Sequence, residues 1–325
     1  MRSILGRVSK RTALSIRQIP RKRFRKWVRR TLVGPAISGA PSPGSVPPPR
    51  SAQTPPILVV GMHRSGTTLL ARILSQAGVF MGRPVTARTH ESPFFVDINE
   101  TIFALAHAYW DQPAPVFDLI TSGTHHRLGH ALGGICSSPW IFSYLGWKKY
   151  RRYRSLYSLN RPWGWKDPRN TFTLPLWLQV FPDAKVIHIV RNGVDVGQSL
   201  VVRARATMHL DRVSSVKCLS LPGAFEVWRQ YVQAGLDHTA GLGPHRLLSI
   251  NYEGLLSDPD AQLRKIGAFV DSPLSDEQLP ELSAQLQTTR AFAFGQDPDL
   301  CAFYDDVRSD PMMRTLGYGE IDLLT

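Results

Sequence analysis

A short loop bounded by two glycines has the residue types of an anion-binding site. Four residues separate Gly61 from Gly66, and Thr67 and Thr68 follow at once, which is the spacing of a phosphate-cradling loop that leads into a helix. Backbone N–H groups and the positive end of the helix dipole meet at one point in such a loop, and threonine hydroxyls add hydrogen bonds to phosphate oxygens. The alternative is a tight strand-to-helix turn without a ligand.

The basic residue of this loop indicates which anion it binds. A nucleoside triphosphatase has a lysine directly after the second glycine, but Thr67 stands there. Arg64, inside the loop, has a planar guanidinium that can bind a terminal phosphate or another anion in a bidentate manner. Asp167 is the one acid at a strand end that could hold magnesium. We therefore expect a nucleotide with a single 5′ anion cluster and no obligatory metal.

A second block further along the chain also has phosphate-binding character. Arg191 stands at the carboxyl end of an expected strand, where parallel sheets bind ligands, and Gly193 lets the chain turn into a helix. Ser199 and Arg203 are four residues apart and share one face of that helix. These three donors can converge on one phosphate. The alternative is an exposed arginine at a strand end and a solvated arginine on a helix.

Strands and helices alternate along the chain from residue 54 onward. A short β-branched run predicts a strand at 57–60, and we expect further strands at 163–165, 185–190 and 246–251. Amphipathic stretches predict helices directly after Gly66 and at 96–109, 171–180, 194–207, 223–240 and 259–270. This alternation predicts an α/β fold, a three-layer αβα arrangement with a central parallel sheet in a single P-loop-containing domain.

Composition excludes several classes of protein. Of 325 residues, 43% are apolar and 20% are charged, which is typical of a globular chain. No stretch approaches the roughly 18 uninterrupted apolar residues of a membrane-spanning helix, so we expect no such segment unless processing has removed one. Cys136, Cys218 and Cys301 lack a C-x-x-C pairing, which argues against a disulfide framework or a structural zinc site. A reducing, cytoplasmic compartment fits best.

The net charge of +14 comes from one end of the chain. Residues 1–50 contain thirteen lysines or arginines and no acid, whereas the other residues contain 26 basic and 25 acidic side chains. A basic stretch is followed by a Pro/Gly/Ser stretch that cannot pack a core. We therefore expect a disordered basic tail at 1–53 and one folded domain at 54–325.

The basic tail has several possible partners. Apolar residues such as Phe24 and Trp27 stand among its arginines, a pattern that suits an anionic membrane surface, nucleic acid or a transit peptide. The alternative is a solvated tail that has no specific binding partner. Specific nucleic-acid binding needs a shaped surface, so we expect none. Peripheral contact with an anionic membrane stays open.

These blocks together resemble a known family. Arg64, Ser65, Gly66, Thr67 and Thr68 are similar to the 5′-phosphosulfate loop of sulfotransferases that use 3′-phosphoadenosine 5′-phosphosulfate (PAPS), in the form found in tyrosylprotein sulfotransferases and their bacterial relatives. The resemblance implies PAPS as donor, adenosine 3′,5′-bisphosphate as product and no metal. Cytosolic sulfotransferases have lysine in place of arginine in this loop, which favours the protein- and carbohydrate-acting branches.

The resemblance continues downstream over about residues 56–270. Arg191, Ser199 and Arg203 match the family's second signature, which holds the 3′-phosphate. Lys166 lies in a Lys-Asp-Pro element whose lysine adjoins the transferring group in the tyrosylprotein branch, and Tyr252 begins a Tyr-Glu pair that is usually structural. The match is specific for cofactor and fold, and much weaker for the acceptor.

Sulfuryl transfer requires a base for the acceptor hydroxyl and positive charge where oxygens gain charge. Glu91, the first carboxylate in the chain, resembles the family's catalytic glutamate in order and approximate spacing, so we assign it as the base. Its rivals are Asp97, His63, His90 and His188.

Two cations complete the expected catalytic set. Arg64 and Lys166 are expected to stabilise the transferring group and the leaving phosphate. For Lys166 the alternative is a strand-end ion pair with Asp167.

The acceptor is not identified by any pattern. The segment between Glu91 and Lys166 is rich in aromatic and basic residues, among them Trp110, Trp140 and Trp147, and suits equally a sugar or anionic acceptor and a helical lid. We expect an acceptor with a hydroxyl group: a carbohydrate, a glycolipid or a protein. The alternative function is a P-loop nucleotide-binding or phosphate-transferring protein without sulfotransferase activity.

Overall fold

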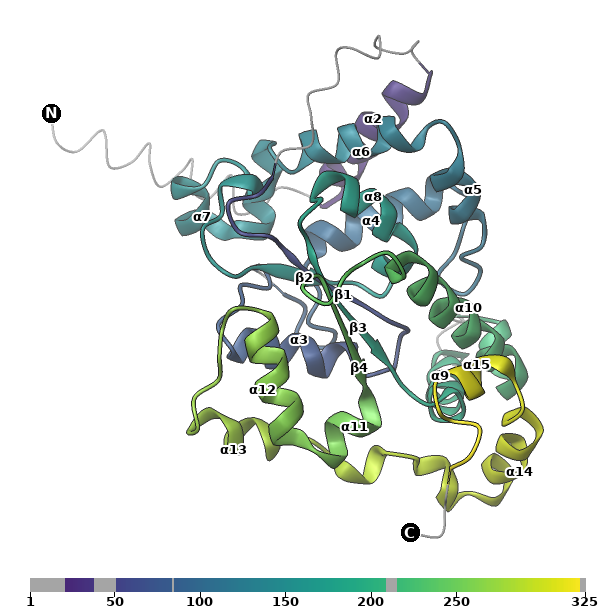
Figure 1. The fold of residues 1–325 in the computed structure, drawn as a ribbon. Coiled ribbons are helices and arrows are strands. Elements are labelled where there is room, and N and C mark those ends of the chain that lie inside the picture. The colour runs from purple at the N-terminus through teal and green to yellow at the C-terminus, as the bar shows by residue number, and fades with distance from the viewer. Residues whose placement is uncertain (1–20, 38–50, 84, 209–214, 322–325) are drawn as a thin grey trace, which may run out of the picture.

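The sheet at the centre of the molecule has four parallel strands in the order β2-β1-β3-β4 (Figure 1). The structure is a computed structural model, and it describes residues 21–37, 51–83, 85–208 and 215–321. Ile57 pairs with Gly164 on one side and with Lys185 on the other, and Val190 pairs with Asn251. The strands are β1 (Ile57–Val60), β2 (Gly164–Lys166), β3 (Lys185–Val190) and β4 (Leu247–Asn251). The predicted parallel sheet is confirmed.

Helices cover both faces of this sheet, because successive side chains of each buried strand point to opposite sides. Ile57 and Val59 belong to one apolar cluster, whereas Leu58 and Val60 belong to the other. The first cluster is closed by α3 (Thr67–Gln76), α11 (Tyr252–Ser257), α12 (Pro259–Phe269) and α13 (Gln278–Ser283). These helices lie together below the sheet in Figure 1.

The other face carries the larger layer. Its helices are α2 (Arg21–Ile37), α4 (Pro93–Leu105), α5 (Pro115–Thr121), α6 (His125–Ile135), α7 (Phe142–Arg152), α8 (Asn170–Val180), α9 (Gly193–Met208), α10 (Leu221–Thr239), α14 (Pro298–Val307) and α15 (Pro311–Thr315). Short 3-10 turns stand between the helices of the two layers at η1 (Pro139–Ile141), η2 (Leu156–Ser158), η3 (Lys217–Leu219), η4 (Thr288–Arg290) and η5 (Ala293–Gln296). The three-layer αβα fold expected from the sequence is therefore present.

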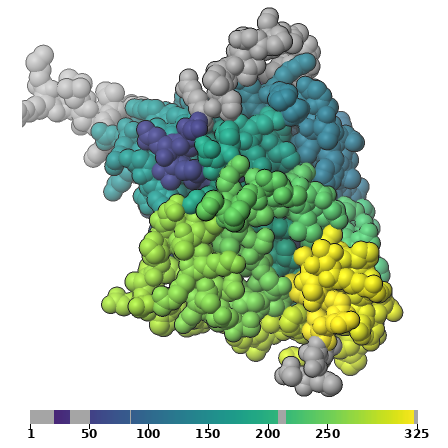
Figure 2. Space-filling view, viewed as in Figure 1, coloured from purple at the N-terminus to yellow at the C-terminus, as the bar shows by residue number. Residues whose placement is uncertain are grey.

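The C-terminal helices belong to the same folded body. Leu300 and Tyr304 of α14 are buried in the larger apolar cluster, and the Tyr304 hydroxyl donates to the Tyr318 carbonyl at 3.0 Å. In the space-filling view the C-terminal segment forms a yellow corner that continues directly into the surface of the earlier helices (Figure 2).

Helix α2 differs from the sequence expectation, which placed residues 21–37 in a disordered tail. Phe24, Val28 and Leu32 stand at helical spacing and are buried, and the Phe24 ring stacks on Phe94 of α4 at 5.2 Å. The charge excess concealed this amphipathic pattern, because the cations occupy the remaining faces of the helix. The rest of the expected tail, except residues 51–53, lies outside the described residues, and the boundary at residue 54 stays a proposal.

Candidate functional site

The loop between β1 and α3 has the backbone of an anion site. Gly61 and Gly66 have φ of 138° and 91°, and a Cβ would lie 2.4 Å from the Ile189 carbonyl oxygen at the first and 2.5 Å from the Tyr252 ring at the second. Only glycine fits both positions. Helix α3 starts at Thr67 without a side-chain cap from Gly66, so its first N–H groups are available to a ligand.

Arg64 joins the two predicted phosphate blocks. Its backbone is left-handed, with φ of 72°, an uncommon conformation for a residue with a side chain. Its Nε donates to the Ser199 hydroxyl at 2.8 Å. Burial lowers the pKa of Arg64, and the neighbouring cations Arg203, Arg290 and Arg191 lower it further. The arginines around Arg64 therefore give this site an excess of positive charge.

Arg191 leaves the end of β3 beside this loop. Its Nη2 donates to Asp195 at 3.0 Å and to the Arg290 carbonyl at 2.7 Å, while its guanidinium lies 4.7 Å over the Tyr252 ring. Its Nε is buried and has no partner within the described part of the chain. The side chain is thus held rigidly, with one donor left for a ligand.

A cavity of about 300 Å³ opens at this edge of the sheet. The predicted residues that line it are Arg64, Gly66, Thr67, Thr68 and Arg191. Residues that sequence reasoning did not assign to the site line it as well: Arg72, Arg88, Tyr252, Gln285, Gln287 and Arg290. Among the residues that the structure describes, no acidic side chain lines this cavity.

Ser65, Ser199 and Arg203 do not line this cavity. Ser65 belongs to the loop, but its hydroxyl is buried without a partner in the described ranges. Ser199 reaches the site through Arg64. The Arg203 guanidinium lies 5.7 Å over the Trp110 ring instead. The convergence of Arg191, Ser199 and Arg203 on one phosphate stays a prediction.

Lys166 and Glu91 form a buried ion pair next to the cavity. Lys166 ends β2 with 2% of its side chain exposed, and its Nζ lies 2.8 Å from Glu91 Oε1 and 3.4 Å from the Thr68 hydroxyl. The other oxygen of Glu91 accepts from the Thr89 hydroxyl at 2.9 Å. Burial lowers the pKa of Lys166, and the Glu91 charge partly offsets this effect. Two of the predicted catalytic residues are thus in direct contact.

Asp167 has partners other than Lys166. It accepts from Arg169 Nη1 at 3.0 Å and from the Asn99 side chain at 3.0 Å. The ion pair between Lys166 and Asp167 that the sequence left open is therefore replaced by one between Lys166 and Glu91. Among the described residues there is also no group of three or more His, Cys, Asp or Glu side chains that could hold a metal.

Comparison with known proteins identifies the family. A model of the Sulfotransferase family matches residues 55–276, which contain both phosphate blocks and Lys166. The chain belongs to the sulfotransferase family.

Several known sulfotransferases resemble parts of this chain. Protein-tyrosine sulfotransferase A of Caenorhabditis elegans is 27% identical over 114 residues, 35% of this chain and 28% of that protein. An omega-hydroxy-beta-dihydromenaquinone-9 sulfotransferase of Mycobacterium bovis is 34% identical over 105 residues, 31% of this chain and 26% of that protein. The matched segments thus span about a quarter of these relatives' own length.

Among solved structures, the sulfotransferase domain of the olefin synthase from Synechococcus PCC 7002 aligns with this chain. The alignment has a TM-score of 0.47 and 21% identity, and it covers 85% of this chain and 98% of that domain.

The rivals of Glu91 in this sulfotransferase are placed in four different surroundings. Asp97 is bound by Arg21 and Arg25 of α2. His90 contacts the Ser75 hydroxyl at 3.1 Å, and His188 is buried in β3 against Gly235, where burial lowers its pKa to about 4.

His63 is the rival that lies at the site itself. Its ring packs edge-on against the Trp110 ring, with the ring centroids 5.1 Å apart. Burial lowers its pKa well below the ordinary range, and Arg169, Arg203 and Lys166 add to the effect, so the imidazole is neutral near pH 7.

Some of the residues that sequence reasoning missed could have been found from a local sequence pattern, and others could not. Arg72 stands one helical turn after Thr68, so the helix period could have placed it at the cavity. Arg88 lies in a loop before Glu91, and Arg290 reaches the site from a distant 3-10 turn, so no local pattern points to either.

The two residues of the Tyr-Glu pair, Tyr252 and Glu253, have different surroundings. Glu253 is buried and accepts from the Asn192 N–H at 2.9 Å and from the Tyr318 hydroxyl at 2.7 Å, a structural role. Tyr252 lines the cavity.

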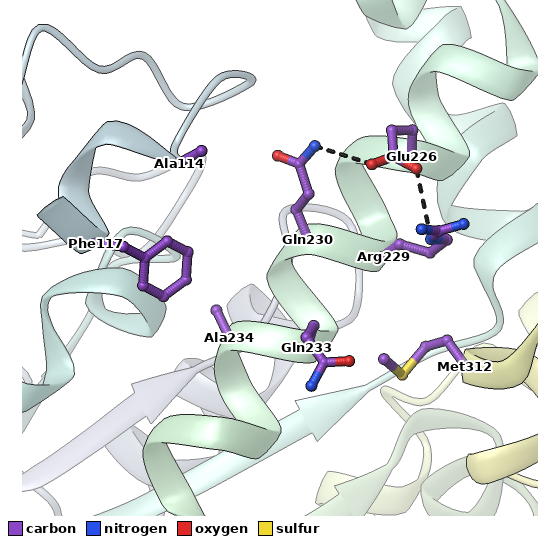
Figure 3. Close-up of a pocket in the computed structure, with 8 residues that line it drawn as sticks. All are labelled: Ala114, Phe117, Glu226, Arg229, Gln230, Gln233, Ala234 and Met312. Atoms are coloured by element: carbon purple, nitrogen blue, oxygen red, sulfur yellow. Dashed lines mark hydrogen bonds and ion pairs between the residues drawn. The ribbon is translucent and has the colours of Figure 1, made fainter.

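A different hollow of about 220 Å³ lies between α10, α5 and α15 (Figure 3). Phe117, Gln230 and Met312 are among its lining residues, and Glu226 forms contacts there with Gln230 and Arg229. None of the predicted site residues lines it.

Proposed function

We propose that this sulfotransferase transfers the sulfuryl group of PAPS to the hydroxyl of an acceptor. The observation that carries the proposal is the cavity at the phosphate loop, which five arginines line without an acid from the described residues. So many guanidinium groups in one place repel one another, and a polyanionic ligand relieves that repulsion. A nucleotide with a 3′-phosphate and a 5′-phosphosulfate has the required charge.

The residues present fit such a nucleotide. The uncapped start of α3 and the hydroxyls of Thr67 and Thr68 suit the 5′ group. The unused Nε of Arg191, a residue that lines the cavity, is a buried polar atom that a ligand would satisfy. We assign Arg191, Ser199 and Arg203 to the 3′-phosphate. This scheme does not require any described residue to act as a metal ligand.

Glu91 is the proposed base and Lys166 its partner. The carboxylate of Glu91 takes the proton of the acceptor hydroxyl, which neutralises it and ends its attraction for Lys166. The Lys166 ammonium, 2.8 Å away at rest, then becomes free to donate to the oxygens of the transferring group and the leaving phosphate. Arg64 supplies a second cation to the same oxygens. The pair therefore couples proton removal to charge stabilisation.

The acceptor carries a hydroxyl in this proposal. The names of two relatives specify a protein tyrosine and an omega-hydroxy menaquinone derivative, and each of these acceptors has a hydroxyl group. Carbohydrate, glycolipid and protein hydroxyls are the classes that we expect from the loop sequence.

Calorimetry separates this function from the alternative of a phosphate-transferring P-loop protein. We expect adenosine 3′,5′-bisphosphate to bind without metal and much more tightly than ATP with magnesium. Tight binding of ATP–magnesium and no binding of the bisphosphate would refute the proposal. A mass-spectrometric screen for products heavier by one sulfuryl group, with PAPS as donor, then tests the transfer itself.

The basic N-terminal segment favours peripheral contact with an anionic membrane from the cytoplasm. Lys22, Arg23, Lys26, Arg29 and Arg30 are exposed on α2, and each cation near an anionic surface contributes about 1 kcal/mol. None of the helices in the described ranges is long and apolar enough to cross a bilayer. Sedimentation with phosphatidylserine vesicles at low and high salt tests this contact, which should weaken as salt rises.

A further inference from the structure

A buried asparagine on α4 joins the segments that carry the proposed transfer residues. Asn99 is 0% exposed, and its amide nitrogen donates to Asp167 at 3.0 Å and to the Asn170 side-chain oxygen at 2.8 Å. Its amide oxygen accepts from the Thr173 hydroxyl and from the Trp177 ring nitrogen, both at 3.0 Å. An amide side chain has two donor hydrogens and two acceptor positions, so all the hydrogen-bonding positions of Asn99 are occupied.

The first turn of α8 connects this network to the sheet. Asn170, which is fully buried, also accepts from the Trp165 ring nitrogen at 3.1 Å and donates to the Val59 carbonyl at 3.4 Å. Thr171, the next residue, accepts at 3.0 Å from the N–H of Gly61, the first glycine of the phosphate loop. One buried cluster of polar groups therefore contacts β1, β2, α4, α8 and the phosphate loop.

The place of Asn99 along α4 relates it to Glu91. Glu91 stands two residues before the start of α4 at Pro93, and Asn99 lies in the second turn of that helix. On the other side of the bond, Asp167 directly follows Lys166, the last residue of β2. The 3.0 Å bond between Asn99 and Asp167 therefore ties the helix that follows the proposed base to the strand end that holds the cation.

Burial makes the bond between Asn99 and Asp167 important for the geometry of the site. Asp167 is 0% exposed, and its carboxylate otherwise accepts from the backbone and side chain of Arg169, each at 3.0 Å. A buried polar network in which each member has its partners holds those members in one arrangement. Without the Asn99 donor, the end of β2 is free to shift relative to α4. The 2.8 Å distance between the Lys166 and Glu91 side chains would then no longer be fixed.

We propose that Asn99 is a positioning residue for sulfuryl transfer, which sets the distance between the proposed base and the cation that serves the transferring group. The inference rests on the proposed sulfotransferase function and adds a residue that acts through Asp167. Asn99 does not line the nucleotide cavity, so its replacement should change turnover and not nucleotide binding.

The test compares two replacements of Asn99 in the full chain. Asn99→Leu keeps a similar size and removes the polar group. Asn99→Asp keeps an acceptor for Thr173 and Trp177 but places a second carboxylate beside Asp167. With PAPS and the acceptor from the mass-spectrometric screen, kcat should fall about ten- to hundredfold in both variants, the loss that a misplacement of about 1 Å can cause. The affinity for adenosine 3′,5′-bisphosphate should not change.

A measurement without substrate follows the surroundings of Lys166 directly. The Glu91 charge raises the pKa of Lys166 against the effect of burial, so a looser pair should lower that pKa. An NMR titration of isotope-labelled lysine side chains, with Lys166→Met to assign the signal, measures this pKa in the substrate-free protein. We expect the pKa to be lower by about 1 in Asn99→Leu than in the wild type.

Leu263→Ala is the control for a general loss of stability. Leu263 of α12 is buried in the apolar layer on the other face of the sheet, so this variant is destabilised without a change to any polar group of the network. Its kcat and the pKa of its Lys166 should equal those of the wild type.

Three results would overturn this inference while the proposed function stands. The first is an unchanged kcat in Asn99→Asp, which also decides the matter if Asn99→Leu does not fold. The second is an unchanged Lys166 pKa in Asn99→Leu, and the third is an equal loss of kcat in Asn99→Leu and Leu263→Ala. Failure of the wild-type chain to bind the bisphosphate would instead refute the proposed function, and this inference with it.

Discussion

Replacement of Glu91 by glutamine separates the chemical role of the Glu91–Lys166 pair from its structural role. The amide keeps the shape of the side chain and an oxygen that can accept from Lys166, but it cannot take a proton at neutral pH. General-base catalysis contributes about 10²–10⁴-fold, so kcat should fall by that factor in Glu91→Gln. The affinity for adenosine 3′,5′-bisphosphate should stay nearly unchanged, because Glu91 does not line the nucleotide cavity.

The stability cost follows from the burial of Lys166. Its side chain is 2% exposed, and the 2.8 Å bond to Glu91 is charge-assisted at both ends. Exchanging such a bond for one with a neutral acceptor costs about 1–2 kcal/mol, whereas Glu91→Ala, which leaves the cation without this partner, should cost about 3–5 kcal/mol. A double variant, Glu91→Gln with Lys166→Met, removes both charges and should recover much of that stability. It should not recover turnover.

Urea unfolding and single-turnover kinetics with the acceptor from the mass-spectrometric screen measure the two effects. Removal of the Glu91 charge should also lower the Lys166 pKa further, because that charge now raises it against burial. The alkaline decline of the residual activity should therefore begin at lower pH in Glu91→Gln than in the wild type. Wild-type turnover in Glu91→Gln, together with loss of turnover in His63→Ala, would refute the assignment of the base.

Three further changes test other parts of the structure. Arg191→Ala should weaken bisphosphate binding about ten- to hundredfold, as expected for a charge-assisted bond to phosphate, and unchanged calorimetric affinity would contradict the site. Leu32→Ala should lower the free energy of unfolding by about 2–4 kcal/mol because Leu32 is 1% exposed, whereas the exposed Lys26→Ala should change it by less than about 0.5 kcal/mol; equal small effects would mean that α2 is not docked. His188 has a folded pKa of about 4, below its ordinary value, so the unfolded chain binds more protons between pH 4 and 6.5 and stability should fall by about 3 kcal/mol as pH decreases through that window. Denaturant titrations of wild type and His188→Leu should differ in this slope, and parallel slopes would contradict the assignment.

Much of the fold could be predicted because the strands are buried on both faces. The runs 57–60 and 185–190 are rich in β-branched residues, and the structure has strands at those residues. The phosphate loop could be predicted for a similar reason, since Gly61 and Gly66 occupy conformations that a side chain would block. In both cases a local physical requirement fixes the residue type, and it can be read without knowledge of the distant contacts.

The parts of the site that could not be predicted depend on contacts between distant segments. The pairing of Lys166 with Glu91 joins residues 75 positions apart, and nothing local favours it over a pairing with Asp167. Arg290 reaches the nucleotide cavity from a 3-10 turn after α13. The chain has 39 lysines and arginines, so charge alone does not select the ones that converge.

The position of α2 shows that the region of family similarity and the folded unit have different limits. The family match begins at residue 55, yet Arg25 of α2 pairs with Glu100, Glu100 lies 3.1 Å from Arg169, and Arg169 lies 3.0 Å from Asp167, the residue next to Lys166. One chain of ion pairs therefore runs from the basic helix to the proposed transfer site. Because Asp97 is also buried beneath the arginines of α2, loss of this helix would uncover both a carboxylate and an apolar face. Helix α2 is thus part of the packed body that supports the site, although the family match begins after it.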